Sequence, residues 1–214
     1  MSPGVKARSP GTERPEDGSV RAKLLESALE LFSSRGYAAT SVREIVERAG
    51  VSKPVLYYHY GSKEGIFLEI MRWLEITLAE TLLGRASGTG SAKHRLRGLC
   101  LDIYDGFSKN RTAVRFLNMV FWGAPQGAPA YDVTAVYGAV QRAFQTLADE
   151  GAAAGEFRGA RPDDVAFAVI AAVSFTMDYE LAYPEQSRGR NGLSRVLDLI
   201  LSGAAKPRRG GVSR

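Results

Sequence analysis

Apolar side chains recur at helical spacing along most of this chain, and this recurrence constrains the fold more than any other feature. One helix face is formed by residues spaced i, i+1, i+4, i+7 and i+8: Leu24, Leu25, Ala28, Leu31 and Phe32. No segment alternates between apolar and polar residues over the length of a strand. The sequence therefore predicts an all-α protein, whose first helix ends at Gly36.

Helix-capping residues predict where the next helices begin. Ser41 and Glu44 form a Ser-x-x-Glu capping box, so a helix begins at Ser41 and ends at Gly50. Ser52 offers an N-cap, with Pro54 in the first turn, and Ser62 caps the helix that follows. Further helices are expected over residues 96–107, 112–122, 131–150, 163–183 and 193–204, between clusters rich in Gly, Pro and Ser.

Composition and charge divide the chain into four parts. We expect a flexible arm at 1–18, a helix-turn-helix domain at 19–65, a larger helical domain at 66–205 and a basic disordered tail at 206–214. The arm has no apolar core of a signal peptide, and no apolar run approaches the roughly 18 residues of a membrane span. We therefore expect a cytoplasmic protein with no membrane partner, and a single cysteine, Cys100, that is buried as a small hydrophobe.

The segment from Val42 to Tyr60 has the offsets of two helices around a tight turn. Val46 lies at the helix crossing, Gly50 supplies a left-handed turn, and Leu56 anchors the second helix. The face opposite Leu56 then presents five residues: Lys53, Pro54, Tyr57, Tyr58 and His59. The stretch 50–61 has no carboxylate, and a helix with such a face fits the major groove of DNA. The net charge of +5 is weaker evidence, because residues 19–73 carry only eight basic against six acidic side chains, and four further basic residues lie in the tail from Gly203.

Four consecutive motifs in this region resemble the tetracycline-repressor (TetR) family: Thr40-Ser41-Val42-Arg43-Glu44-Ile45, Ala49-Gly50-Val51-Ser52-Lys53-Pro54, Leu56-Tyr57-Tyr58-His59-Tyr60 and Ser62-Lys63-Glu64. The resemblance spans about residues 19–70, and it departs from the family at Val46, where alanine is usual. It implies a symmetric homodimer on a pseudo-palindromic double-stranded DNA operator, with a C-terminal domain that binds an unidentified small-molecule effector.

The same resemblance implies which residues face DNA. They are Arg43, Ser52, Lys53, Pro54, Tyr57, Tyr58, His59 and Lys63, with Ser52 donating to a phosphate. Other roles stay open for four aromatic or basic residues. Tyr60 is expected in the core, Tyr58 is either exposed or half-buried, His59 is a helix-end cation or a phosphate contact, and Lys63 is a DNA contact or a solvated lysine.

The helix at 163–183 is apolar nearly all round, so it must be buried on several sides. Pairing it with the segment 193–204 across a two-fold axis builds a four-helix dimer interface. Aromatic side chains, together with the Asp178 carboxylate beyond the first turn of this helix, also predict an apolar effector pocket. Its candidate residues are Phe116, Met119, Trp122, Tyr137, Phe144, Phe175, Asp178 and Tyr179, and each of them is alternatively a core residue.

The sequence gives little support for an enzymatic function. Two histidines, one cysteine and no paired metal-ligand spacing predict no metal, no cofactor and no catalytic residue. The glycine-rich stretch 84–93 lacks the Gly-Lys-Ser/Thr of a phosphate loop. We therefore expect a transcriptional regulator, most simply a repressor, although an activator has the same N-terminal domain. The alternative is a helical ligand- or partner-binding module that does not use its helix-turn-helix on DNA.

Overall fold

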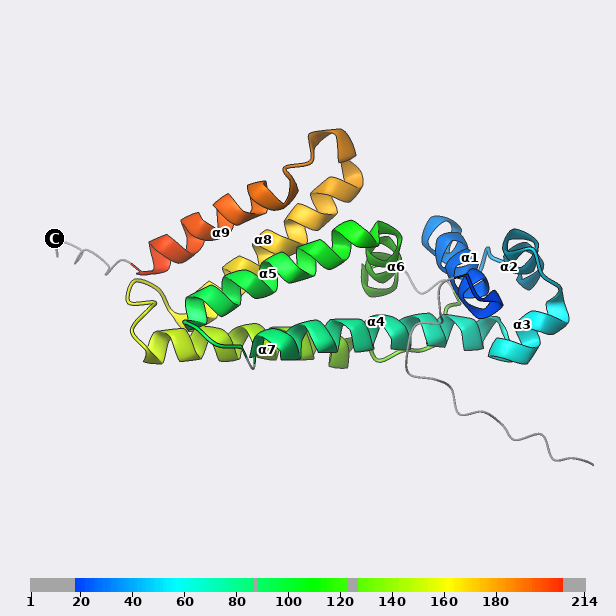
Figure 1. Cartoon of the computed structure of the whole chain (residues 1–214), viewed down its shortest axis with the longest axis horizontal. Coiled ribbons are helices and arrows are strands. Elements are labelled where there is room, and N and C mark those ends of the chain that lie inside the picture. The colour runs from blue at the N-terminus through cyan, green and yellow to red at the C-terminus, as the bar shows by residue number, and fades with distance from the viewer. Residues whose placement is uncertain (1–17, 87, 123–126, 206–214) are drawn as a thin grey trace, which may run out of the picture. The chain divides into compact units, whose positions relative to one another are not determined.

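A computed structural model describes residues 18–86, 88–122 and 127–205. Its regular structure comprises α1 (Val20–Arg35), α2 (Val42–Ala49), α3 (Lys53–Tyr60), α4 (Lys63–Ala86), α5 (Ala92–Lys109), α6 (Arg111–Trp122), α7 (Val133–Ala153), α8 (Pro162–Ala182), the 3-10 helix η1 (Pro184–Gln186) and α9 (Gly189–Ala205). Figure 1 shows these helices in chain order. The described residues contain no strand, so the predicted all-α class is confirmed.

The described residues divide into two compact units, and the boundary lies inside α4, between Ile76 and Thr77. Residues 127–130 group with the first unit. The predicted division after residue 65 falls near the start of α4 instead, and it stays a prediction. The predicted tail, and the predicted arm up to residue 17, lie outside the described residues.

The first unit is organised around the apolar face of α1. Phe32 is fully buried, and its ring lies 5.3 Å from the ring of Tyr37 and 5.9 Å from that of Phe67 on α4. The five α1 residues predicted for this face are all buried. Gly36 follows the helix with φ 84°, a backbone conformation that disfavours side chains, and its N–H donates to Phe32 O. The predicted end of α1 is therefore confirmed.

The second unit has a core formed by α5, α7, α8 and α9 with the end of α4 (Figure 1). Phe144 and Leu197 are fully buried there, and so is Cys100. Burial raises the pKa of the Cys100 thiol to about 12, so the side chain is a neutral hydrophobe, as predicted.

One side of α8 packs into this core and another side does not. Val165, Val169 and Val173 are buried, whereas Phe167 and Phe175 are 76% and 69% exposed. The expectation of burial on several sides is therefore met on one side only within a single chain.

By length and composition alone, α8 is also long and apolar enough to cross a membrane. This corrects our expectation that no segment qualifies. The difference arises because the acidic residues near the two ends of α8 break the strict apolar run without lowering its mean hydropathy enough. Core helices of globular proteins pass the same test.

Candidate nucleic-acid interface

Local hydrogen bonds fix the start and the end of α2. The Ser41 hydroxyl accepts the N–H of Glu44 at 3.2 Å, and the Glu44 carboxylate accepts the N–H of Ser41 at 2.8 Å, which completes the predicted capping box. Gly50 ends the helix in the left-handed conformation, with φ 68° and ψ 34°. The Val51 N–H then donates to Val46 O at 2.9 Å, which closes the turn. The sequence-predicted geometry of this turn is confirmed.

Buried side chains on α2 and α3 hold the two helices together. Val46 and Leu56 are 4% and 0% exposed, as their predicted roles at the helix crossing and as an anchor require. Because Leu56 points inward, the opposite face of α3 is exposed, and Tyr58 is 84% accessible. The open question about Tyr58 is thus answered in favour of exposure.

The start of α3 leaves a hydroxyl uncommitted. Ser52 has the extended backbone of an N-cap residue, but its side chain makes no capping hydrogen bond. The predicted side-chain cap is therefore absent, although Pro54 does occupy the first turn. An exposed hydroxyl beside the free N–H groups of a helix start is suited to a phosphate oxygen.

Cations in the first unit differ sharply in whether a carboxylate neutralises them. All five arginines in the described part of this unit form ion pairs, namely Arg21, Arg35, Arg43, Arg48 and Arg72. Lys53 on α3, by contrast, is exposed and has no ion-pair partner among the described residues. Within the described part of this unit, exposed positive charge that no carboxylate neutralises is therefore carried by Lys53 on α3 and Lys23 on α1, and not by the arginines of α2.

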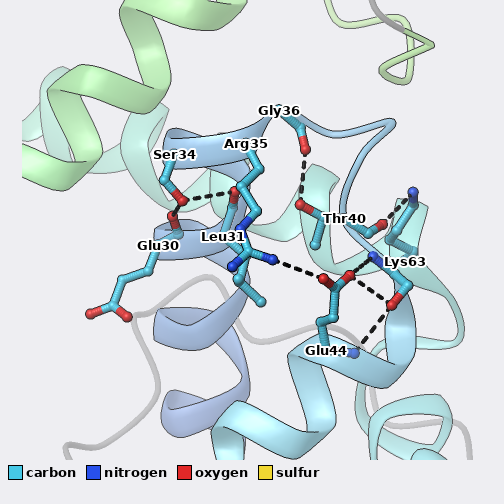
Figure 2. Close-up of polar contacts among 9 residues, drawn as sticks. Glu30, Leu31, Ser34, Arg35, Gly36, Thr40, Glu44 and Lys63 are labelled. Carbon is cyan, nitrogen blue, oxygen red and sulfur yellow. Dashed lines mark hydrogen bonds and ion pairs between the residues drawn. The ribbon is translucent and has the colours of Figure 1, made fainter.

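Lys63, at the start of α4, faces the protein rather than solvent. Its ammonium donates to Tyr37 O at 2.9 Å and to Thr40 O at 2.8 Å, and it lies 4.1 Å from the centre of the Tyr37 ring. Partial burial lowers the pKa of Lys63. Figure 2 shows the hydrogen bond from Lys63 to Thr40 beside the Arg35–Glu44 pair, which joins α1 to α2. Two of the three ammonium N–H groups thus hold the loop before α2, and one is left for a phosphate.

Tyr60 and His59 take different places at the end of α3. The Tyr60 hydroxyl donates to Arg21 O at 2.7 Å, and burial raises the pKa of this phenol. Tyr60 is therefore a packing residue, as expected. The His59 ring packs edge-on against the Tyr58 ring at 5.1 Å, and it is half-buried.

The eight candidate effector residues differ widely in exposure. Phe116 and Phe144 are fully buried, whereas Trp122 and Tyr137 are exposed. The others are an exposed Phe175, half-buried Met119 and Tyr179, and an exposed Asp178 that accepts from Asn118 Nδ2 at 2.7 Å. A cavity of about 260 Å³ is lined by two of the eight, Phe175 and Tyr179, with Ala172, Thr176, Glu180, Arg188 and Val196.

Sequence reasoning missed Glu180, the second carboxylate beyond the first turn of α8. It is 1% exposed, and it accepts from Tyr104 Oη at 2.8 Å and from the Gly189 N–H at 3.0 Å. The buried stripe of α8 continues to Glu180 at helical spacing, and this signal is visible in the sequence. A carboxylate on an apolar stripe indicates a polar contact inside the domain.

A larger cavity of about 650 Å³ lies between the end of α4 and α5. Charged and polar groups predominate among its lining residues, which are Glu80, Thr81, Gly84, Arg85, Gly88, Thr89, His94, Arg95 and Asp102. Arg85 is held there by Asp102 through two hydrogen bonds of 2.5 and 2.9 Å. None of the eight candidate effector residues lines this cavity. Among the described residues, no group of three or more His, Cys, Asp or Glu side chains is arranged to hold a metal ion.

Comparison with known proteins gives this geometry a context. A family model described as "Bacterial regulatory proteins, tetR family" matches residues 24–70, which include α2 and α3. The chain is 34% identical over 107 residues to the HTH-type transcriptional activator FasR of Mycolicibacterium smegmatis, covering 50% of this chain and 48% of FasR. It is 32% identical over 96 residues to the HTH-type transcriptional repressor KstR2 of Mycobacterium tuberculosis, covering 45% of this chain and 48% of KstR2.

Solved structures extend the likeness of fold beyond the matched sequence. The structure of KstR2, a ketosteroid transcriptional regulator of Mycobacterium tuberculosis, has a TM-score of 0.72 at 22% identity, and the match covers 89% of this chain and 97% of that one. PfmR of Thermus thermophilus, a TetR family transcriptional regulator, has a TM-score of 0.69 at 25% identity, covering 86% and 99%. In sequence, the chain spans about half the length of the curated relatives that it matches. Residues 24–70 therefore match the TetR family of bacterial regulatory proteins in sequence, and the helical fold of the chain is similar to that of a solved TetR family regulator.

Proposed function

We propose that the chain is a sequence-specific DNA-binding transcription regulator, a repressor released from a pseudo-palindromic operator by a small-molecule effector. The observation that carries this proposal is the outer surface of α3. Lys53, Tyr57 and Tyr58 are exposed there, and the stretch 50–61 contains no carboxylate. Exposed tyrosines on a helix that a buried leucine holds in place have an apolar surface that a DNA groove would cover.

The proposed DNA contacts fall into two chemical classes, contacts to phosphates and contacts to bases. Lys53 and the Ser52 hydroxyl suit phosphate oxygens, which set the register of the helix on the duplex. Pro54, Tyr57 and Tyr58 suit base edges and thymine methyl groups, which carry sequence information. Arg43, His59 and the remaining Lys63 N–H stay proposed phosphate contacts at the edge of this surface.

We propose a homodimer formed by α8 and α9. Phe167 and Phe175 on α8 and Leu199 on α9 are all more than two-thirds exposed. Large apolar side chains on two neighbouring helices are costly in water, and a second copy of the same surface buries them in a four-helix arrangement. Two recognition helices also double the phosphate and base contacts on a palindromic site.

The effector site belongs to the second unit. The wall formed by Phe175, Tyr179 and Glu180 combines aromatic rings with a buried carboxylate that already pairs with Arg111 at 3.4 Å, so it suits a small hydroxyl-bearing molecule better than a cation. Asp178 is exposed and bonded to Asn118, so Asp178→Asn should leave effector affinity unchanged. Glu180→Gln should lower it.

Of repression and activation, repression is the simpler mode of regulation. The named relatives include the activator FasR and the repressor KstR2. A repressor needs only to occupy its operator, whereas an activator also needs a surface that recruits the polymerase. We further propose that the chain acts in the cytoplasm and catalyses no reaction, in keeping with relatives that are named as transcriptional regulators.

DNA binding can be tested without knowing the operator. A duplex is selected from a random pool on the full chain, and its dissociation constant is measured over a salt series against a scrambled duplex. We expect preference for the selected duplex and a steep fall of affinity with salt. Lys53→Ala should weaken binding and lower the salt slope by about one per protomer. Lys109→Ala, an exposed lysine of the second unit, is the matched control.

A weak, salt-insensitive signal without sequence preference would favour the competing function, a helical ligand- or partner-binding module. In that case Lys53→Ala and Lys109→Ala would have equal effects.

A further inference from the structure

On the outer surface of α2, an ion pair within the protein neutralises the charge of Arg43, which is a proposed DNA contact. Arg43 Nε donates to Glu47 Oε1 at 2.6 Å, and the two side chains are 74% and 57% exposed. They lie one helical turn apart, on the side of α2 opposite the buried Ile45. In the absence of DNA, the Glu47 carboxylate is therefore the counterion of Arg43.

Two of the other arginine pairs in the first unit join α1 to α2. Arg35 binds Glu44 of the capping box, and Arg48 joins α2 to Glu30 on α1. Arg43 and Glu47, in contrast, belong to the same short helix and connect it to nothing else that the structure describes.

The orientation of the Arg43–Glu47 pair is also poor for helix stability. Its cation lies in the first turn of α2 and its anion in the last turn. The helix dipole favours the opposite arrangement, and a pair with the basic residue first is the weaker order at i, i+4. A contribution to the stability of α2 therefore does not explain why these charges stand in this order.

We infer that Glu47 is a specificity-determining residue, whose carboxylate competes with DNA phosphates for Arg43. This inference rests on the proposed DNA-binding function. On an arbitrary duplex, Arg43 stays with Glu47 and adds little affinity. On the operator, base contacts by α3 fix the register, and a phosphate placed against Arg43 displaces the carboxylate.

The release of counterions from DNA predicts how strongly Glu47 should change the salt dependence of binding. A cation that is already neutralised by a carboxylate displaces no condensed counterion from DNA, whereas a free one steepens the salt dependence by about 0.9 per phosphate contact. Glu47→Gln frees Arg43 without changing the shape of the side chain. On the scrambled duplex we expect tighter binding and a salt slope steeper by about one per protomer. On the selected duplex the gain should be smaller, so the ratio of the two affinities should fall.

A double-mutant cycle tests whether Glu47 acts through Arg43. The full chain is compared with Glu47→Gln, Arg43→Ala and the double variant on the selected and the scrambled duplex, and thermal unfolding reports on folding. We expect the Glu47→Gln effect to disappear when Arg43 is absent. An effect of equal size in both backgrounds would mean that Glu47 simply repels phosphates, and it would overturn the inference.

Failure of this inference is distinguishable from failure of the proposed function. If the unmodified chain prefers its selected duplex but Glu47→Gln leaves the salt slope and the affinity ratio unchanged, the inference alone is wrong. If the unmodified chain shows no preference for any duplex, the proposed function is wrong and the inference falls with it.

Discussion

Gly50 provides the sharpest test of how the turn between α2 and α3 is built. A Cβ atom added at this position would meet no atom within 4 Å, so a substitution there has room. The backbone, however, is left-handed, with φ 68° and ψ 34°. Gly50→Ala should therefore cost only the conformational penalty, about 1–2 kcal/mol for an L-residue in this region. In a chain of 214 residues, that corresponds to a fall of about 2–8 °C in the unfolding midpoint.

Two matched variants separate backbone strain from other effects of substituting a glycine. Gly50→Asn should cost less than Gly50→Ala, because asparagine tolerates the left-handed region better. Gly106→Ala, at an equally open position inside α5, should raise the midpoint, because alanine is favoured over glycine within a helix by about 1 kcal/mol. Thermal unfolding followed by circular dichroism measures all three. An unchanged midpoint in Gly50→Ala, or equal losses in Gly50→Ala and Gly50→Asn, would refute the reasoning.

Three further perturbations have distinct expected outcomes. Lys63→Met should lower thermal stability by about 1 kcal/mol, because it leaves two carbonyls without their hydrogen-bond donor, and it should also lower DNA affinity. Lys53→Ala should lower DNA affinity alone. Phe167→Glu should shift sedimentation from dimer to monomer and leave the helical content unchanged. The Arg97 guanidinium lowers the pKa of Asp198, so Asp198→Asn should cost at most about 1 kcal/mol at neutral pH. That difference should shrink in urea titrations as the pH falls below the ordinary aspartate pKa of 3.8, because the lowered pKa stabilises the fold only while the carboxylate is charged.

Features that depend on local sequence were predictable. The capping box at Ser41, the turn at Gly50 and the buried anchor Leu56 each follow from residues within a few positions of one another, and all three are confirmed. The helix ranges are correct to within a few residues for the same reason. Local hydrogen bonds and helical periodicity leave the chain few alternatives at these places.

Features that depend on side-chain direction or on distant partners were not predictable. The sequence places Lys63 at a helix start, but it does not say that the ammonium turns back onto Tyr37 and Thr40. Nor does it say whether Arg43 pairs with Glu47 or extends into solvent. The exposure of the predicted effector residues was not predictable either, because aromatic residues on a shared set of helices can point into the core, into a cavity or outward.

The central claim is that the outer face of α3 meets DNA. Amide chemical-shift mapping of the full chain during titration with its selected duplex tests this most directly. We expect the largest changes at residues 50–61 and at the start of α2, with a stoichiometry of two protomers per palindromic site. Binding of the duplex with α3 unperturbed, and with the changes at helices of the second unit instead, would contradict the account.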